Sequence, residues 1–206
     1  MLLYIYSTKN YTLLIMDSLH QFMNQISPIS NESYEAYMNL CSERSYKAGT
    51  LLDKIGEIPE SIYFIKSGIA RSYSISKKGV EYIRSLVSAN NILAATEALL
   101  NKIPSKIACQ CLTDCEVLEM KYADLIALLK KNYEISAWYT KTLELHYAHL
   151  QKMNDELLTL NATDRYLRLQ KRIPNIDNRI NQYHIAANLG ITPIQLSRIR
   201  KKLYNK

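Results

Sequence analysis

The chain has 206 residues, enough for one large or two small domains that each bury a core of their own. The composition, with 48% hydrophobic and 22% charged residues, is typical of a soluble globular protein, which we expect to lie in the cytoplasm. No segment approaches the roughly 20 consecutive apolar residues of a membrane-spanning helix, which argues against a membrane protein. The net charge is +7, but residues 161–206 hold ten basic and two acidic residues, so the first 160 carry a net charge of −1. Positive charge gathered in one segment predicts a polyanionic partner.

The N-terminal half is predicted to be a short helical opening followed by β structure. Residues 1–16 are apolar but lack the basic region and cleavage site of a signal peptide, so we interpret them as an extension. Helices are expected over about residues 17–42. Residues 44–120 then alternate apolar and polar side chains, with turns at Gly68 and Gly79.

Two further helices are expected over residues 122–131 and 133–160. The longer one carries apolar positions at alternating spacings of three and four, namely Leu143, His146, Leu150, Met153, Leu157 and Leu160. That heptad pattern with polar flanks favours a parallel two-stranded dimer helix, and the alternative is a helix buried against its own domain. Asn161 to Thr163 interrupt the pattern as a hinge, with Thr163 expected to cap a helix over 164–172.

The last helices carry the strongest local signals. Residues 180–202 read INQYHIAANLGITPIQLSRIRKK, two short helices joined by Gly190, which suits the left-handed residue after a helix. Thr192 is expected to cap the second helix, with Pro193 at its first position and Gln195 completing a capping box. This pattern predicts a helix-turn-helix whose second helix enters a DNA major groove. The alternative is an ordinary helical hairpin with a solvated basic face.

The whole arrangement resembles the Crp/Fnr family of bacterial transcription regulators over about residues 16–202. The matching strings are residues 47–52 (KAGTLL), 62–68 (IYFIKSG), 190–193 (GITP) and 196–200 (LSRIR), and they look most like the Bacteroidetes branch. The resemblance implies an α+β chain. Its expected parts are a cyclic-nucleotide-binding-like jelly roll (17–132), a dimerisation helix (133–160) and a winged helix-turn-helix (161–206). It also implies a homodimer on double-stranded DNA, with RNA polymerase as a further partner.

Within the DNA-binding interpretation, Arg198 matches the family position that reaches into the groove. Gln195 and Ser197 are further candidates for contacts with base edges. The candidates for phosphate contacts are Thr192, Arg200, Lys201, Lys202, Gln182 and His184. Pro193 and Ile194 occupy two usual base-reading positions of the family, and neither side chain can form a hydrogen bond there. The operator is therefore expected to differ from that of the cAMP-dependent members.

The effector pocket departs from the family pattern. The Gly-Glu pair that holds the ribose of a cyclic nucleotide falls at Ala94-Ala95, and the phosphate-binding Arg-Ser pair falls at Ser105-Lys106. The ribose carboxylate is missing unless Glu97 replaces it with a shift of register, and the arginine is missing too. We therefore expect no cyclic nucleotide, and instead an unidentified small-molecule effector or none.

Other cofactors and activities find little support in the sequence. Cys41, Cys109, Cys111 and Cys115 are numerous enough for an iron–sulfur cluster, but buried reduced thiols are the favoured interpretation. His146 and His149 on the dimer helix are expected to be packed rather than to bind haem. Because no nucleophile–base pair, metal-binding spacing or phosphate-binding glycine loop occurs, we expect neither an enzyme nor a bound cofactor. The competing function is a ligand-binding or assembly jelly roll whose helix-turn-helix does not read DNA.

Overall fold

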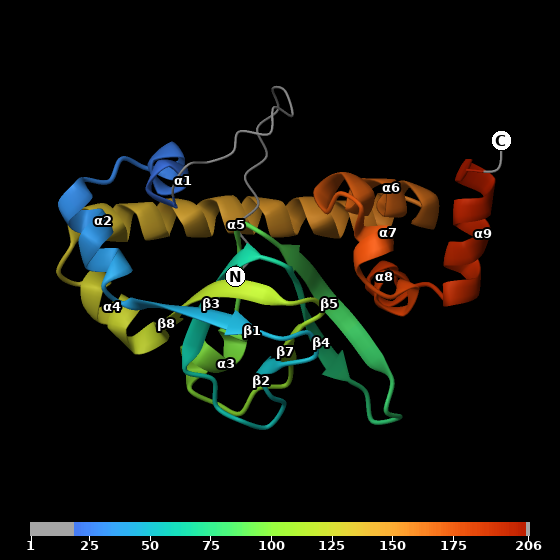
Figure 1. Cartoon of the computed structure of the whole chain (residues 1–206), viewed down its shortest axis with the longest axis horizontal. Helices are drawn as coiled ribbons and strands as arrows, with labels where there is room; N and C mark the ends of the chain where they lie inside the picture. The colour runs from blue at the N-terminus through green and yellow to red at the C-terminus, as the bar shows by residue number, and fades with distance from the viewer. Residues whose placement is uncertain (1–18, 205–206) are drawn as a thin grey trace.

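The computed structural model describes residues 19–204, and its parts are arranged along one long helix (Figure 1). The interpretation of residues 1–16 falls outside this range. The chain opens with α1 (Leu19–Ile26) and α2 (Asn31–Met38), which lie beside the N-terminal half of α5 (Tyr133–Thr159). Glu134 fixes this junction, because its carboxylate accepts hydrogen bonds from the backbone N–H and the hydroxyl of Ser30, at 2.8 and 2.7 Å.

Residues 41–121 form the expected β-roll, built from two four-stranded antiparallel sheets. The first sheet has the order β1-β8-β3-β6 and the second β2-β7-β4-β5. The strands are β1 (Cys41–Tyr46), β2 (Leu51–Asp53), β3 (Ser61–Ser67), β4 (Ile69–Ile75), β5 (Glu81–Ser88), β6 (Asn91–Leu93), β7 (Ala108–Cys111) and β8 (Cys115–Lys121). The short helix α3 (Thr96–Asn101) interrupts the second half of the roll.

Gly68 is the tightest of the turns in the roll. Its φ is +96°, a region that side chains disfavour. A Cβ at this position would lie 2.5 Å from Cys115 Sγ and against the carbonyl oxygen of Asp114. The Ser67–Ile69 turn therefore requires glycine both for its backbone conformation and for the space beside β8.

Strand β4 is buried on both faces, which an ordinary surface strand is not. Every residue from Ile69 to Tyr73 is buried. Ala70 faces the interior of the roll, whereas Ile69 and Tyr73 belong to a core shared with the C-terminal helices. That shared core also contains Tyr166, Ile185 and Leu196. The helical domain therefore packs directly on the outer face of the β4–β5 sheet.

After α4 (Tyr122–Leu129), helix α5 presents two different faces. Ile135, Trp138, Thr142 and His149 are buried against the same chain. Leu143, Tyr147, Leu150 and Leu157 are 40 to 64% exposed. Within residues 19–204, no helix has both the length and the hydropathy of a membrane span.

The C-terminal domain is helical throughout its described residues. It comprises α6 (Ala162–Arg172), α7 (Ile176–Arg179), α8 (Gln182–Leu189) and α9 (Pro193–Tyr204). The cap of α6 is Asn161 rather than the expected Thr163, because the Asn161 side chain accepts from the N–H of Asp164 at 3.0 Å. The expected wing is not found, since no strand follows β8 up to residue 204. Between α6 and α8 the chain instead forms α7, and Ile176 and Ile180 from this segment are buried in the shared core.

Candidate nucleic-acid interface and sensor pocket

The helix-turn-helix is fixed by backbone chemistry at its turn. Gly190 adopts the left-handed conformation at φ 67°, and its neighbour Ile191 donates its N–H to the Ala186 carbonyl at 3.0 Å. The capping box is present as predicted. The Gln195 N–H donates to Thr192 Oγ1 at 3.2 Å, and the Thr192 N–H donates to Gln195 Oε1 at 2.9 Å.

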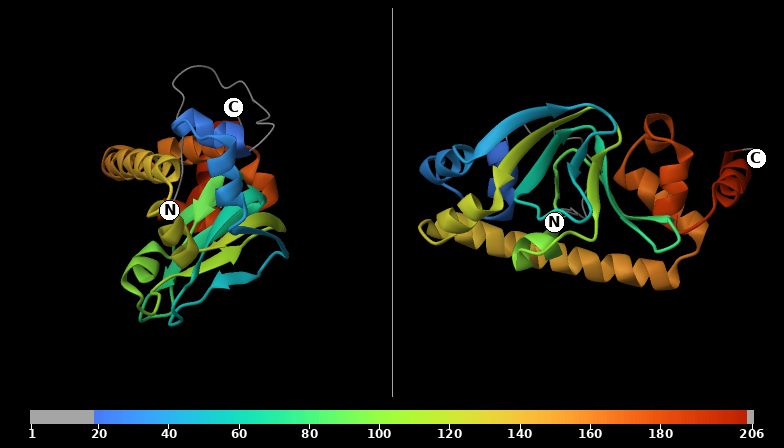
Figure 2. Two further views of the ribbon diagram at one scale, coloured as in Figure 1. Left: turned by 90° about the vertical axis from the view of Figure 1, so that its left-hand side faces the viewer. Right: turned by 90° about the horizontal axis from the view of Figure 1, so that it is seen from below.

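Helix α9 buries one stripe and leaves a polar face open. Leu196 is fully buried, and Ile199 and Leu203 pack partly against the same core. The side chains that face solvent are Thr192, Gln195, Ser197, Arg198, Lys201 and Lys202. In Figure 1 and in the right-hand view of Figure 2, α9 lies at one end of the molecule. An exposed basic helix at a molecular end is sterically able to enter a groove of DNA.

Three other predicted DNA contacts lie in different surroundings. Gln182 is exposed at the start of α8. Arg200 is half-buried, and its Nε lies 3.7 Å from the Asp177 carboxylate on α7. His184 faces the β-roll, where its Nδ1 lies 3.3 Å from Arg71 Nη1. His184 is thus at the boundary between the two domains rather than on the open face of α9.

A groove of about 660 Å³ separates the start of α6 from α9. Its walls include Asn161 and Thr163 on one side and Gln195, Arg198 and Lys202 on the other. Its charged lining residues are Arg198, Lys202 and Asp164, so the two cations and the positive end of the α6 dipole outnumber one carboxylate. The groove extends the basic face of α9 toward the hinge.

The positions where the resemblance predicts contacts with a cyclic nucleotide carry neither an arginine nor a carboxylate that faces the interior of the roll. Ala94 and Ala95 are buried and offer no polar side chain. Ser105 is 3% exposed, and its hydroxyl donates to the Ile107 carbonyl at 2.6 Å. Glu97 and Lys106 pair with each other on the surface, at 3.2 Å, with more than 60% of each side chain exposed. Glu97 therefore does not point into the roll as a replacement ribose carboxylate.

Asp53 is an acid inside the roll that sequence analysis did not single out. It is 7% exposed, and Tyr63 donates to its Oδ1 at 3.4 Å. Burial raises the pKa of Asp53, while hydrogen bonds from Cys109, Tyr63 and the backbone of Ala95 oppose the rise. The chain thus supplies its own acidic group beside the turn that opens α3. No periodicity or spacing marks Asp53, because its importance comes only from the folding of β2 against β7.

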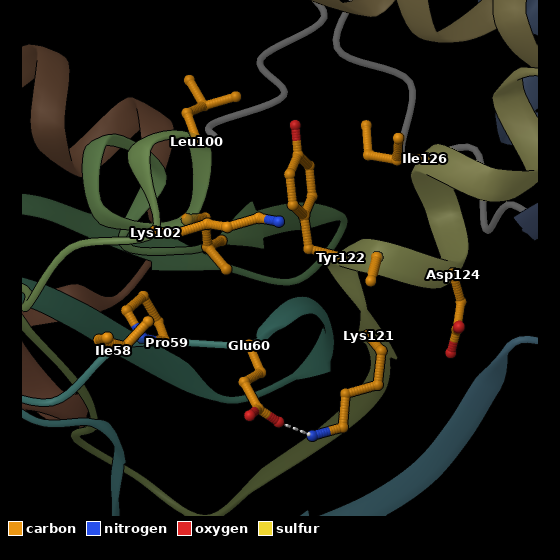
Figure 3. A pocket seen from close by; sticks show the side chains of 11 residues that line it. Ile58, Pro59, Glu60, Leu100, Lys102, Lys121, Tyr122, Asp124 and Ile126 are labelled. Carbon is orange, nitrogen blue, oxygen red and sulfur yellow. Dashed lines mark hydrogen bonds and ion pairs between the residues drawn. The ribbon is translucent and has the colours of Figure 1, made fainter.

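Two hollows adjoin α3 outside the roll. One, of about 130 Å³, lies between α3 and α5 and is lined mainly by apolar side chains, with Ala94, Leu99, Tyr139, Leu143 and His146 among them. The other is an open pocket of about 770 Å³ on the outer surface (Figure 3). Ile58 and Leu100 line it, and the Glu60–Lys121 ion pair lies at its edge.

The predicted seam residues of α5 divide into two groups. Leu143, Leu150 and Leu157 are exposed, in agreement with an intermolecular face. His146, Met153 and Leu160 are half-buried. Met153 contacts α6 of the same chain, since its sulfur accepts from Arg172 Nη1 at 3.8 Å. His149 is buried, and burial together with nearby Arg172 lowers its pKa to about 4.

The cysteines are free thiols and three of them are buried. Cys109, Cys111 and Cys115 belong to the core of the roll. The Cys111 thiol donates to Cys115, which raises the pKa of Cys111 and lowers that of Cys115. Across residues 19–204, no group of three or more His, Cys, Asp or Glu side chains is placed to hold a metal ion.

Comparison with known proteins agrees with this architecture. Residues 43–132 match the family model of the cyclic nucleotide-binding domain. No curated protein matches the chain in sequence.

Solved structures of similar fold extend the likeness beyond the β-roll. FixK2 from Bradyrhizobium japonicum is 19% identical, with 80% of this chain and 85% of that chain covered and a TM-score of 0.66. A Crp/Fnr-family regulator from Eubacterium rectale is 12% identical (84% and 83% covered, TM-score 0.63). The Thermus thermophilus catabolite activator protein is 18% identical (87% and 86% covered, TM-score 0.54). Residues 43–132 therefore match the cyclic nucleotide-binding domain family, and the chain as a whole has a fold similar to those of solved Crp/Fnr transcription regulators.

Proposed function

We propose that the protein is a homodimeric, sequence-specific DNA-binding regulator of transcription, acting in the cytoplasm. The observation that carries this proposal is the capped helix α9 with its open face of Gln195, Ser197 and Arg198. Arg198 offers the planar fork that hydrogen-bonds guanine in the major groove. Lys201 and Lys202 continue the exposed basic face and are suited to phosphates.

The proposed dimer interface is the exposed face of α5, shifted slightly from the predicted seam. Leu143, Leu150 and Leu157 recur every seven residues, and the exposed Tyr147 and Asn154 lie between them. These five positions form one a/d stripe of a coiled coil, with Asn154 at an a position. A buried asparagine pair at a single a position favours a parallel two-stranded register, which is the geometry a twofold-symmetric operator requires.

The effector of this regulator is not a cyclic nucleotide in our proposal. The positions where the resemblance predicts the nucleotide contacts offer no arginine for a phosphate, since Ser105 bonds the Ile107 carbonyl and Lys106 pairs with Glu97 at the surface. The carboxylate inside the roll is that of Asp53, and its Oδ1 already accepts from Tyr63. The small hollow between α3 and α5 is mainly apolar. A hollow with this apolar lining disfavours the binding of a charged, sugar-bearing ligand.

The test is binding of the ligand-free full-length dimer to its own upstream DNA and to a scrambled duplex, across a salt series. We expect tighter binding to the upstream DNA, with log affinity falling against log salt at a slope near −0.9 per phosphate contact. Equal, salt-insensitive affinity for both duplexes would favour the alternative, an assembly jelly roll whose helix-turn-helix contacts only protein.

A further inference from the structure

The boundary between the β-roll and the helix-turn-helix contains a polar contact inside an apolar interface. Helix α8 lies against β5, and both views of the molecule show the helical domain beside the β4–β5 hairpin (Figures 1 and 2). Around this contact, Ile69, Tyr73 and Ile83 of the roll share a core with Ile185 and Ala186 of α8. The first helix of the DNA-binding unit is thereby docked on the sensor domain.

Arg71 is the charged group that the roll presents to α8. It is only 4% exposed. Its Nη1 lies 2.6 Å and its Nη2 3.3 Å from the two oxygens of the Glu81 carboxylate, and its Nε donates to Gln110 at 2.9 Å. The guanidinium also stacks 3.9 Å above the Tyr73 ring. These contacts come from β4, β5 and β7, so the position of the guanidinium depends on three of the four strands of the second sheet.

The partner of Arg71 on α8 is a neutral histidine. Arginine has hydrogen-bond donors and no acceptor, so the His184 Nδ1 at 3.3 Å must accept and carries no proton. Among the described residues, the charged groups that face the imidazole from the roll are Arg71 of β4 and Glu81 of β5. On α8 itself the Tyr183 ring meets it edge-on at 5.4 Å. Protonation would place an N–H against the arginine donors and set two positive charges in contact.

We propose that the Arg71–His184 contact is a proton-sensitive latch that docks α8 on the β-roll and so holds the recognition helix α9 in a fixed orientation. Docking leaves Gln195, Ser197 and Arg198 open, so the latch does not cover the DNA-reading face. It acts by pre-orienting that face, because a domain already held in place loses less freedom when it binds DNA. The inference rests on the proposed function only for this last step.

The expected direction with pH follows from the contact. Burial lowers the pKa of His184, Arg71 lowers it further, and Glu81 opposes the change. The undocked domain therefore binds a proton more readily than the docked one, and docking weakens as pH falls through the ordinary histidine pKa of 6.5. The docking constant therefore has its largest value well above pH 6.5. Between pH 7.5 and 5.5 the docking constant should fall by up to about tenfold.

The latch can be tested without DNA, by pulsed EPR distances between spin labels on Lys78→Cys in the β4–β5 turn and Asn178→Cys on α7. The background carries Cys41→Ser, and labelled subunits are diluted with unlabelled ones. We expect a single distance at pH 7.5 and a second, broader population at pH 5.5. His184→Asn keeps an acceptor for Arg71 and cannot titrate, so it should stay docked at both pH values. His184→Lys should undock at both.

His20→Asn is the matched control, because His20 lies far from the contact, stacked on Tyr34. This variant should respond to pH as the unmodified chain does. The buried His149 is present in every variant, so a response that is lost only in His184→Asn must come from His184. The proposal is overturned if His184→Asn undocks with acid as the unmodified protein does, or if neither undocks. Operator affinity measured on the same samples should fall with undocking, and unchanged affinity would remove the pre-orienting role. Loss of sequence-specific binding at pH 7.5 would instead count against the proposed function.

Discussion

The polar side chains on the surface of α9 differ from those inside the β-roll in whether they face solvent or are hydrogen-bonded within the chain. On α9, Gln195, Ser197 and Arg198 face solvent. In the roll, Ser105 is bonded to Ile107 and Asp53 to Tyr63, each within the chain itself. A surface whose donors are open is available to an external partner, whereas a group that is already bonded inside the chain, such as the Ser105 hydroxyl, gains little from a polar ligand. This difference is the basis of our proposal that α9 contacts DNA and that the effector, if any, is not a cyclic nucleotide.

The largest effect should come from breaking the proposed dimer, on which the whole output surface depends. Leu150→Glu places two charges face to face at the centre of the exposed stripe of α5. We expect a monomer in analytical ultracentrifugation and a loss of operator affinity of about 100-fold, because two linked half-site contacts become one. Met153→Gln is the matched control, since Met153 faces Arg172 of its own chain. A monomer from Met153→Gln would restore the originally predicted seam, which contains Met153 as well as Leu150. A dimer from Leu150→Glu would contradict both versions of the interface.

The next effect concerns the reading of bases. Arg198→Ala should cost about 1–3 kcal/mol of operator binding and reduce the preference for operator over scrambled DNA. Lys202→Ala serves as the comparison, because a phosphate contact affects all sequences alike and lowers the salt slope by about one. Both variants are measured by fluorescence anisotropy at several salt concentrations. An unchanged sequence preference in Arg198→Ala would move base reading to Gln195 and Ser197.

A smaller effect should follow from removing the cap of α9. Thr192→Ala leaves the Gln195 N–H without its acceptor, and loss of such a cap costs about 1 kcal/mol. For a chain of this size the midpoint of thermal unfolding should fall by about 2–4 °C. Ser197→Ala lies on the exposed face of the same helix and should leave the midpoint unchanged. Equal midpoints for both variants would mean that α9 is held by its buried stripe alone.

The sequence predicted best what neighbouring residues decide among themselves. The turn at Gly190 and the capping box of Thr192 and Gln195 involve residues within a few positions, so their chemistry is visible in the string. The cap of α6 shows the limit, because Asn161 and Thr163 are both good capping residues and only the backbone chooses between them. The expected wing is not found up to residue 204 for a related reason, since Ile176 and Ile180 pack into a core shared with distant strands, and such packing is not visible locally.

Contacts between distant segments could not be predicted. Arg71 and His184 are 113 positions apart, and neither belongs to a motif. The seam on α5 shows the same difficulty within a single helix. Its apolar positions serve two faces, one packed on the same chain and one exposed, and a spacing of three and four does not separate them. The contact between Met153 and Arg172 of α6 shows which of the two faces is packed on the same chain, and this contact is known only from the structure.

The smallest expected effect is that of cyclic AMP, and it tests the sensor side of the comparison directly. A ligand present at 100 times its dissociation constant stabilises a protein by about 2.7 kcal/mol, which a thermal scan detects easily. We expect 1 mM cAMP to shift the unfolding midpoint no more than 1 mM AMP does. The buried Ser105 offers no positive charge for the phosphate, and Lys106 stays paired with Glu97 at the surface. A shift specific to cAMP would contradict the proposal that the effector is not a cyclic nucleotide, and it would make Ser105 and Asp53 the first residues to examine for contacts with the ligand.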